Sequence, residues 1–355
     1  METASYEYYI QYLSIVKYVF LFIGLCAFLY YSVRKQLKPL PKIIVFLLFA
    51  GMVVLLGAFP MIEGGADRNG YFAEAESVAK YGVAFQTNDI GYYYVNRILT
   101  IFPLNWYFYL HSFMYVWCIY WFSKSSSMKQ YGILFLCMLL NFQFVAYGVN
   151  TMRAGLAGSL VLLAITFRNK RLTELTILLI AVLVHKSFVL PAICYLIAKK
   201  YDYTRLFFAL WLLAIPLSAA FGGFFQGILG TVLGADERAS YLTTKATDTL
   251  YRVGFRIDFI LYSCMPIVIG YYMIYRLKFK DTFYMNLYNM YILANTFWIL
   301  VIRADYSDRF AYLSWFIYCP ILIYPVIKQP DIVKNTNKWI ACCVLYLTMF
   351  LTFVG

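Results

Sequence analysis

Two ionisable residues, Arg153 and His185, lie within long apolar stretches of this sequence. Arg153 is 15 residues from the basic residue Arg168, or about 22 Å along a helix. His185 is 14 residues from both Arg171 and Lys199, or about 21 Å along a helix in either direction. In a bilayer core about 30 Å thick, both would lie about 8 Å below the surface opposite those basic residues. An ionisable group at that depth needs a water-filled cavity or a charged partner, which predicts a cleft with both residues on its floor.

Each residue also has a structural explanation. A long arginine side chain near a helix end can extend to the membrane surface, and Gly155 and Gly158 after Arg153 allow close helix packing. His185 could be a satisfied turn residue at the apex of a helical hairpin. The short arms on both sides of it and the adjacent Lys186 favour a discontinuous element instead. We favour a functional role for Arg153 and His185.

Further candidates lie in segments that we predict to be outside the membrane. Asp67 follows a glycine pair just after an apolar run, where its carboxylate could act as a general base toward a hydroxyl. Tyr71 and the tyrosines near residue 93 could stack on sugars, although an interfacial belt explains most of them. Between the last apolar runs, Arg303 and Arg309 could each donate paired hydrogen bonds to phosphate oxygens. A solvated turn with internal ion pairs explains these arginines equally well.

A second outer segment, 222–254, has mixed charge and is too long for a simple connection. This length suggests a lid or a loop that handles substrate. Arg252 and Arg256 lie one helical turn apart where the segment enters the next apolar run, and they could share an anionic ligand.

Apolar helices must position these residues. Hydrophobic residues make up 63% of the 355 residues and charged residues 13%, against about half and a quarter in soluble domains. Basic clusters between the apolar runs hold 18 of the 30 Lys and Arg residues with only four acids. Nearly all of the net charge of +13 therefore lies on one side, which the positive-inside rule places in the cytoplasm. The basic residues therefore indicate which ends of the spans face the cytoplasm, and we expect no nucleic-acid partner.

We therefore predict an all-α, polytopic transmembrane bundle of about eleven to twelve spans that forms a single domain, 1–355. The outer segments are 63–103 and 222–254, and the stretch 172–198 rises and returns. The other spans are 8–32, 43–62, 104–122, 131–149, 153–167, 206–221, 255–275, 283–302, 309–327 and 339–354. The eight cysteines fall in apolar runs without metal-site spacing, and nucleotide-binding and metalloprotease motifs are missing, so we expect no metal and no cofactor.

Five short motifs resemble the EpsG/Wzy family of bacterial polysaccharide (O-antigen, capsule, exopolysaccharide) repeat-unit polymerases. They are Asp67 to Tyr71, Gly91 to Arg97, Arg153-x-Gly-x-Ala157, His185-Lys-Ser187 and Asp308 to Tyr312. The resemblance implies a GT-C-like membrane glycosyltransferase in the bacterial cytoplasmic (inner) membrane, with its active site facing the periplasm or exterior. It implies transfer of a growing glycan from undecaprenyl pyrophosphate to an incoming lipid-linked repeat unit. The implied partners are these glycan donors and acceptors, membrane lipids, and a chain-length regulator and flippase of the same pathway.

Under this interpretation, Arg153, Arg303 and Arg309 stabilise the departing pyrophosphate. His185 or Asp67 deprotonates the acceptor hydroxyl, with His185 narrowly favoured, and the small residues after Arg153 give space for lipid tails. The remaining pyrophosphate or glycan contacts are Arg252, Arg256, Tyr71, Asp308 and Tyr312.

Two other functions compete with polymerisation. A flippase or another transporter also uses broken helices and intramembrane arginines, and an O-antigen-ligase-like transferase would move the glycan to a different acceptor. The one-sided placement of the polar residues and the lack of obvious internal symmetry favour the polymerase.

Overall fold

The computed structural model describes residues 4–62, 66–84, 89–126, 129–233, 254–304 and 307–353. Within these ranges the regular structure is helical apart from one isolated bridge between Ala4 and Ile62. The all-α prediction is thus confirmed. The chain forms two compact units, one of Met1–Val189 with Ile323–Gly355 and one of Leu190–Leu322.

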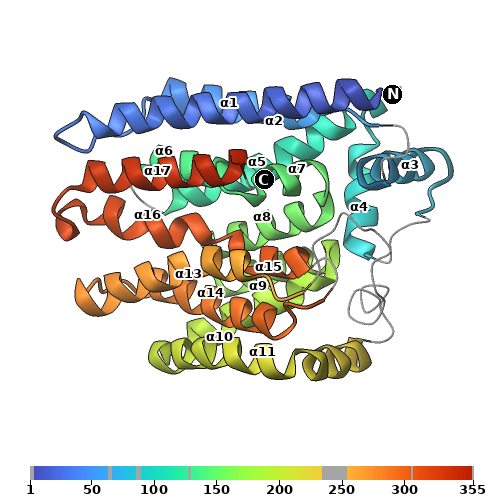
Figure 1. Cartoon of the computed structure of the whole chain (residues 1–355). Helices are drawn as coiled ribbons and strands as arrows, with labels where there is room; N and C mark the ends of the chain where they lie inside the picture. The colour runs from blue at the N-terminus through green and yellow to red at the C-terminus, as the bar shows by residue number, and fades with distance from the viewer. Residues whose placement is uncertain are drawn as a thin grey trace. The chain divides into compact units, whose positions relative to one another are not determined.

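Long apolar helices frame the first unit (Figure 1). α1 (Tyr6–Ser32) packs along α17 (Thr336–Phe353), and α2 (Lys42–Gly57) packs on α5 (Tyr107–Ser125). An apolar run with few charges favours a helix because a helix satisfies its own backbone hydrogen bonds without water. A short 3-10 turn, Pro330–Ile332, precedes α17.

Two shorter helices, α8 (Met152–Thr166) and α9 (Arg171–Val184), pack against each other, and α8 also packs on α5. The predicted close packing after Arg153 is confirmed, because Gly155 lies directly against the Tyr147 backbone. A Cβ at Gly158 would lie 3.1 Å from the Phe188 ring. The predicted space for lipid tails is therefore wrong, since neighbouring groups fill it.

The predicted span 131–149 is broken. α6 (Tyr131–Leu139) and α7 (Gln143–Val149) meet at an angle of 71°. Asn141 lies buried at the bend, and its carbonyl accepts the N–H of Phe144 as α7 begins. Asparagine favours turns because its side chain competes for backbone hydrogen bonds.

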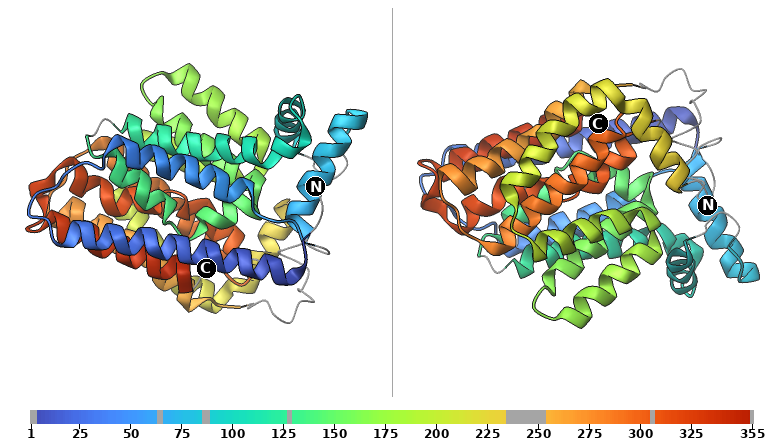
Figure 2. Two further views of the ribbon diagram at one scale, coloured as in Figure 1. Left: turned by 90° about the horizontal axis from the view of Figure 1, so that it is seen from above. Right: turned by 90° about the horizontal axis from the view of Figure 1, so that it is seen from below.

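The predicted outer segment 63–103 contains two helices, α3 (Ala66–Tyr81) and α4 (Ile90–Leu99), followed by a 3-10 turn at Leu104–Trp106. α4 crosses the direction of α1 and α17 in Figure 1, and both views of Figure 2 show it nearly end-on. It packs on α3 and α9.

The stretch 172–198 is discontinuous, as predicted. α9 ends at Val184, His185 is extended, Lys186–Phe188 form a 3-10 turn, and α10 spans Val189–Lys200. Pro191 falls in the first turn of α10, where its missing N–H costs no helical bond.

The second unit contains α11 (Thr204–Leu233), α13 (Ile257–Tyr271), α14 (Thr282–Leu300) and α15 (Ser307–Trp315). α13 continues as a π-helical turn over Tyr272–Arg276, and α16 (Tyr318–Lys328) crosses the boundary between the units. The helix breaks at Phe221, where the backbone leaves helical geometry, so the end of the predicted span 206–221 coincides with this kink; a further helical part then continues to Leu233.

A buried polar network holds this second unit together. The Asn295 amide accepts from Trp211 Nε1 at 2.8 Å and donates to the hydroxyls of Ser263 and Ser314. The Ser263 hydroxyl also accepts from Trp315 Nε1 at 2.7 Å. Such buried polar groups favour one arrangement of the helices because each leaves an unpaired group if the packing shifts.

Five of the described helices are long and apolar enough to cross a membrane, or six if the bent pair α6 and α7 is one span. They are Tyr6–Ser32, Thr204–Phe225, Ile257–Arg276, Ser307–Lys328 and Thr336–Phe353. This count is lower than the eleven to twelve predicted spans. α2 and α8 are apolar but shorter, and α9 and α10 have only 14 and 12 residues.

Candidate active site

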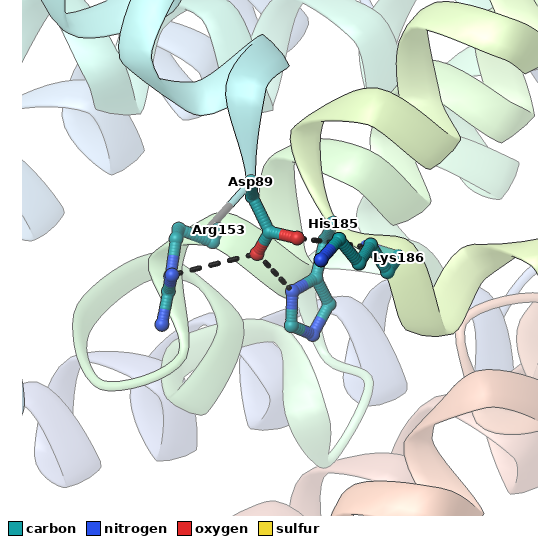
Figure 3. A network of polar contacts seen from close by, with 4 residues as sticks. All are labelled: Asp89, Arg153, His185 and Lys186. Atoms are coloured by element: carbon teal, nitrogen blue, oxygen red, sulfur yellow. Dashed lines mark hydrogen bonds and ion pairs between the residues drawn. The ribbon is translucent and has the colours of Figure 1, made fainter. Parts of the chain in front are cut away.

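The carboxylate of Asp89 joins three groups from two other segments (Figure 3). Its Oδ2 atom lies 3.4 Å from Arg153 Nη1 and 3.2 Å from His185 Nδ1. Its Oδ1 atom accepts the backbone N–H of Lys186 at 3.2 Å. The Asp89 side chain is fully buried, whereas Arg153 is 26% and His185 16% exposed. A buried carboxylate thus holds two accessible, chemically active side chains in one place.

Each of these residues stands at a helix end. Asp89 is the N-cap residue of α4, but its carboxylate does not cap that helix. Arg153 lies in the first turn of α8. His185 follows the last residue of α9 in extended conformation, with φ −154° and ψ 108°. Because the helix stops there, the N–H of Lys186 has no helical acceptor, and the Asp89 carboxylate takes that place.

Gly91 sets how closely α4 approaches α9. A Cβ at this position would lie 2.5 Å from the carbonyl carbon of Leu183 and 2.6 Å from the nitrogen of Val184. Asp89 is two residues before Gly91, and His185 directly follows Val184. The missing side chain of Gly91 therefore brings the Asp89 carboxylate within hydrogen-bond reach of the imidazole.

The contact with Asp89 also determines the tautomer of His185. With the Asp89 carboxylate ionised, it can only accept hydrogen bonds; Nδ1 then carries the hydrogen, and the basic lone pair lies on Nε2. The imidazole can then take a proton at Nε2, and the carboxylate stabilises the imidazolium that forms. Arg153 supplies a permanent positive charge beside the same carboxylate. The combination is a base next to an anion-binding group.

Aromatic rings surround the guanidinium of Arg153. Its carbon lies 5.8 Å from the ring centre of Tyr71 and 5.9 Å from that of Tyr92. Behind them, the hydroxyls of Tyr92 and Tyr107 are 3.1 Å apart, and Tyr107 donates to Asn96 Oδ1 at 2.8 Å. These buried bonds hold the helix that carries Asp89 against α5.

A second carboxyl group, Glu74, is buried on α3 near this site. It is 2% exposed, and its Oε1 has no hydrogen-bond partner within the described part of the chain. Burial raises the pKa of Glu74, the positive charge of Arg153 opposes the rise and Asp89 adds to it. Burial likewise raises the pKa of Tyr71, with Arg153 again opposing. Both groups are therefore near enough to feel the charge of Arg153.

Asp67 lies on α3, close to Tyr71. It is exposed in the first turn of α3, one helical turn before Tyr71, and its charge acts on the Tyr71 hydroxyl. Tyr71 is partly buried and faces Arg153. The structure thus brings Arg153, His185 and Tyr71 together, and Asp67 is the exposed member of the predicted set. The roles predicted for these residues stay predictions.

Arg303, in the second unit, has a structural partner. Its Nη2 donates to the carbonyl of Ala219 at 2.9 Å, two residues before the kink at Phe221. A Cβ at Gly222 would lie 2.6 Å from Arg303 Cδ. Arg303 therefore supports the kinked part of α11, and it is exposed.

The other predicted ligands in this unit gather at the starts of α13 and α15. Arg256 forms a 2.6 Å ion pair with Asp258 and lies 3.7 Å from the Phe259 ring centre. The charges of the predicted ligands Asp308, Arg309 and Arg256 all act on the hydroxyl of Tyr312. Arg252 lies outside the described residues. His111, the other of the two histidines in the chain, is fully buried beside Tyr92.

Sequence analysis missed Asp89 and Glu74. Two signals pointed to Asp89. It directly precedes a helix, as N-cap residues do, and Arg153 within an apolar region requires a counter-charge. Several acids of the outer segment met that requirement, and their distances to Arg153 depend on the tertiary structure. Among the described residues, no group of three or more His, Cys, Asp or Glu side chains could hold a metal ion.

The model of the EpsG family matches residues 42–354 of this chain, a range that includes every residue of the Asp89 site. The chain belongs to the EpsG family. Membership supports a polysaccharide polymerase-type function in general terms, and together with the five apolar helices it indicates a multi-pass membrane protein. Comparisons of this EpsG-family chain with curated proteins and with solved structures give no match.

Proposed function

We propose that this EpsG-family protein is a membrane glycosyltransferase that polymerises undecaprenyl-pyrophosphate-linked oligosaccharide repeat units. It acts at the periplasmic or outer face of the bacterial cytoplasmic membrane and releases undecaprenyl pyrophosphate. The observation that carries the proposal is the Asp89 carboxylate that bonds to both Arg153 and His185. The charge asymmetry of the connecting segments supports the outward-facing orientation.

In the proposed reaction, Nε2 of His185 takes the proton of an acceptor sugar hydroxyl. The hydroxyl oxygen attacks the anomeric carbon of the lipid-linked donor glycan. The bond from that carbon to the pyrophosphate oxygen breaks, and its electron pair leaves with the pyrophosphate. Asp89 lies against the opposite nitrogen of the ring, so its charge stabilises the imidazolium. A positioned base of this kind contributes about 10²- to 10⁴-fold to a rate.

Arg153 is the proposed ligand of the leaving pyrophosphate. Its guanidinium is partly exposed and held by Asp89 on one side, so it is oriented before substrate binds. Donors that are fixed before the reaction stabilise developing charge without reorganising during it. Arg303, Arg309 and Arg256 are further proposed pyrophosphate or glycan contacts, as are Asp308 and Tyr312.

Asp67 and Tyr71 are proposed to contact the acceptor glycan. Asp67 is exposed, and Tyr71 lies one turn further along α3, between Asp67 and Arg153. A tyrosine ring can stack on the apolar face of a sugar, and a carboxylate can accept hydrogen bonds from its hydroxyls. We assign the base to His185 because Asp89 fixes its tautomer.

The test is polymerisation by the purified protein in detergent with a synthetic lipid-pyrophosphate-linked repeat unit from the host strain. We expect a ladder of products from the wild type and losses of at least about 10²-fold in Arg153→Ala and His185→Ala. Asp67→Ala should lose less. Lys80→Ala, on an exposed charged face of α3, serves as the control and should keep wild-type activity.

Two results would overturn the proposal. Folded protein that makes no ladder but moves the same lipid across proteoliposome bilayers would be a transporter. Transfer of the glycan only to a different lipid acceptor would identify a ligase.

A further inference from the structure

One face of α4 is apolar and exposed although the helix is short. Ile101, two residues past the end of the helix, is exposed. Within α4, Ile90, Tyr94 and Ile98 are each more than half exposed and follow one another at intervals of four residues. Such spacing places them in one stripe along a helix. The opposite side of α4 is buried and carries Tyr92, Val95, Asn96 and Leu99. α4 therefore has two different faces, and no described part of the chain covers the exposed one.

The direction of α4 suits a helix that lies in a membrane surface. In Figure 1 it runs across α1 and α17, and Figure 2 shows it end-on while those two helices are seen lengthwise. α1 and α17 are both long and apolar enough to cross a membrane. If they cross the bilayer, α4 lies parallel to its plane, as interfacial amphipathic helices do.

Exposed apolar surfaces adjoin both ends of α4. At its start, Gly91 contacts the end of α9, whose exposed residues include Leu179 and Leu183. After its end, Trp106 is exposed, and α5 continues with exposed residues at Phe113, Trp117 and Trp121. The apolar stripe of α4 thus continues surfaces that a multi-pass membrane protein turns toward lipid.

Charge and aromatic residues on α4 agree with this placement. Arg97 is exposed next to the stripe, where its long side chain can reach lipid phosphates while its stem stays on apolar ground. Tyr94 lies within the stripe, and tyrosine is enriched at membrane surfaces because its ring is apolar and its hydroxyl polar.

We propose that α4 lies in the membrane–water interface with Ile90, Tyr94 and Ile98, and Ile101 just past its end, in contact with bilayer lipid. Asp89 directly precedes Ile90, so lipid contact along α4 also holds the carboxylate that orients Arg153 and His185. Only this link to catalysis rests on the proposed function. The contact between α4 and lipid stands on the exposed stripe and on the direction of the helix.

The test uses photo-crosslinking with the full chain in proteoliposomes of phosphatidylethanolamine and phosphatidylglycerol. Benzoylphenylalanine replaces Tyr94 or Ile98 in separate variants, and Lys80 in the control. Tyr94 and Ile98 are 58% and 59% exposed, and the side chain of Lys80, on the charged face of α3, is 58% exposed. We expect a lipid-sized mass increase after illumination at positions 94 and 98 that exceeds the increase at position 80 at least fivefold.

Lipid crosslinking at 94 and 98 no higher than at 80 would overturn the proposal, as would crosslinks from these positions to protein alone. The link to the site is tested by Ile98→Asp, which puts a charge at an exposed position of the stripe, with folding of the variant checked by its thermal midpoint. We expect its polymer formation to fall at least tenfold while Arg97→Lys retains activity. Full activity of a folded Ile98→Asp variant would remove the link. The crosslinking result does not depend on activity, so it separates this inference from the proposed function.

Discussion

Nδ1 of His185 lies 3.2 Å from the buried carboxylate of Asp89, which orients the imidazole and leaves Nε2 as its basic atom. The two residues are 96 positions apart in sequence. They meet because α4 approaches the end of α9 at Gly91 and because α9 stops before His185. The same carboxylate satisfies the N–H that the break exposes at Lys186. One side chain therefore supports both the backbone and the proposed chemistry.

Asp89→Asn should abolish most of the activity while the fold persists. The amide of asparagine can donate a hydrogen bond to Nδ1, which moves the imidazole hydrogen to Nε2 and removes the base. We expect polymer formation to fall about 10²- to 10⁴-fold at neutral pH. The thermal midpoint should also fall, because Arg153 loses its charged partner. Wild-type rates in folded Asp89→Asn would show that the carboxylate is not part of the reaction.

Arg153→Lys should separate charge from geometry. Lysine keeps the positive charge but lacks the planar fork that matches phosphate oxygens. We expect a loss of about 10- to 100-fold, or about 1.4 to 2.7 kcal/mol in the barrier, and a larger loss in Arg153→Ala. The comparison requires turnover at saturating lipid-linked substrate. Equal rates in Arg153→Lys and the wild type would mean that only charge matters at this position.

Gly91→Ala should disturb the site without touching a charged residue. Its Cβ would lie 2.5 Å from the Leu183 carbonyl carbon, so α4 has to move away from α9 and carry Asp89 with it. We expect a stability loss of about 1 to 3 kcal/mol, as for other overpacked sites, and a loss of activity beyond it. Gly51→Ala is the matched control, since nothing lies within 4 Å of a Cβ there. Equal behaviour of both variants in thermal unfolding and turnover would contradict the proposed role of Gly91.

Glu74→Gln should change how stability depends on pH. Burial raises the pKa of Glu74 above the usual value of 4.5, so the folded protein keeps this proton where the unfolded chain has lost it. Stability of the wild type therefore falls as pH rises from 4.5 through the raised value, and the cost persists above it. Glutamine has no proton to lose. The gain of Glu74→Gln in thermal midpoint should increase from pH 4.5 toward neutral pH.

Glu76→Gln is the control for this measurement. Glu76 is exposed on the same helix, and the hydrogen bond from Lys80 lowers the pKa of its carboxyl. Glu76→Gln should give no gain in thermal midpoint at neutral pH, because the pair with Lys80 favours the charged carboxylate in the folded protein. A constant difference between Glu74→Gln and the wild type across this pH range would argue against a raised pKa for Glu74.

The sequence by itself determined that this protein is an all-helical, multi-pass membrane protein, because apolar runs and their spacing follow from bilayer thickness and backbone hydrogen bonding. It also marked Arg153 and His185, since an ionisable side chain in an apolar stretch is costly without a function. The break at His185 could be predicted from the short arms on either side of it. These features are local, or repeat over about twenty residues.

The tertiary structure alone decided which acid pairs with Arg153 and His185. Five acids lie in or next to the first outer segment, and composition does not show which of them pairs with Arg153 and His185. Asp89 meets both residues because Gly91 allows α4 to touch α9, whereas Asp67 lies exposed at the start of α3. Contacts between residues distant in sequence depend on helix directions and packing distances, which hydropathy does not encode.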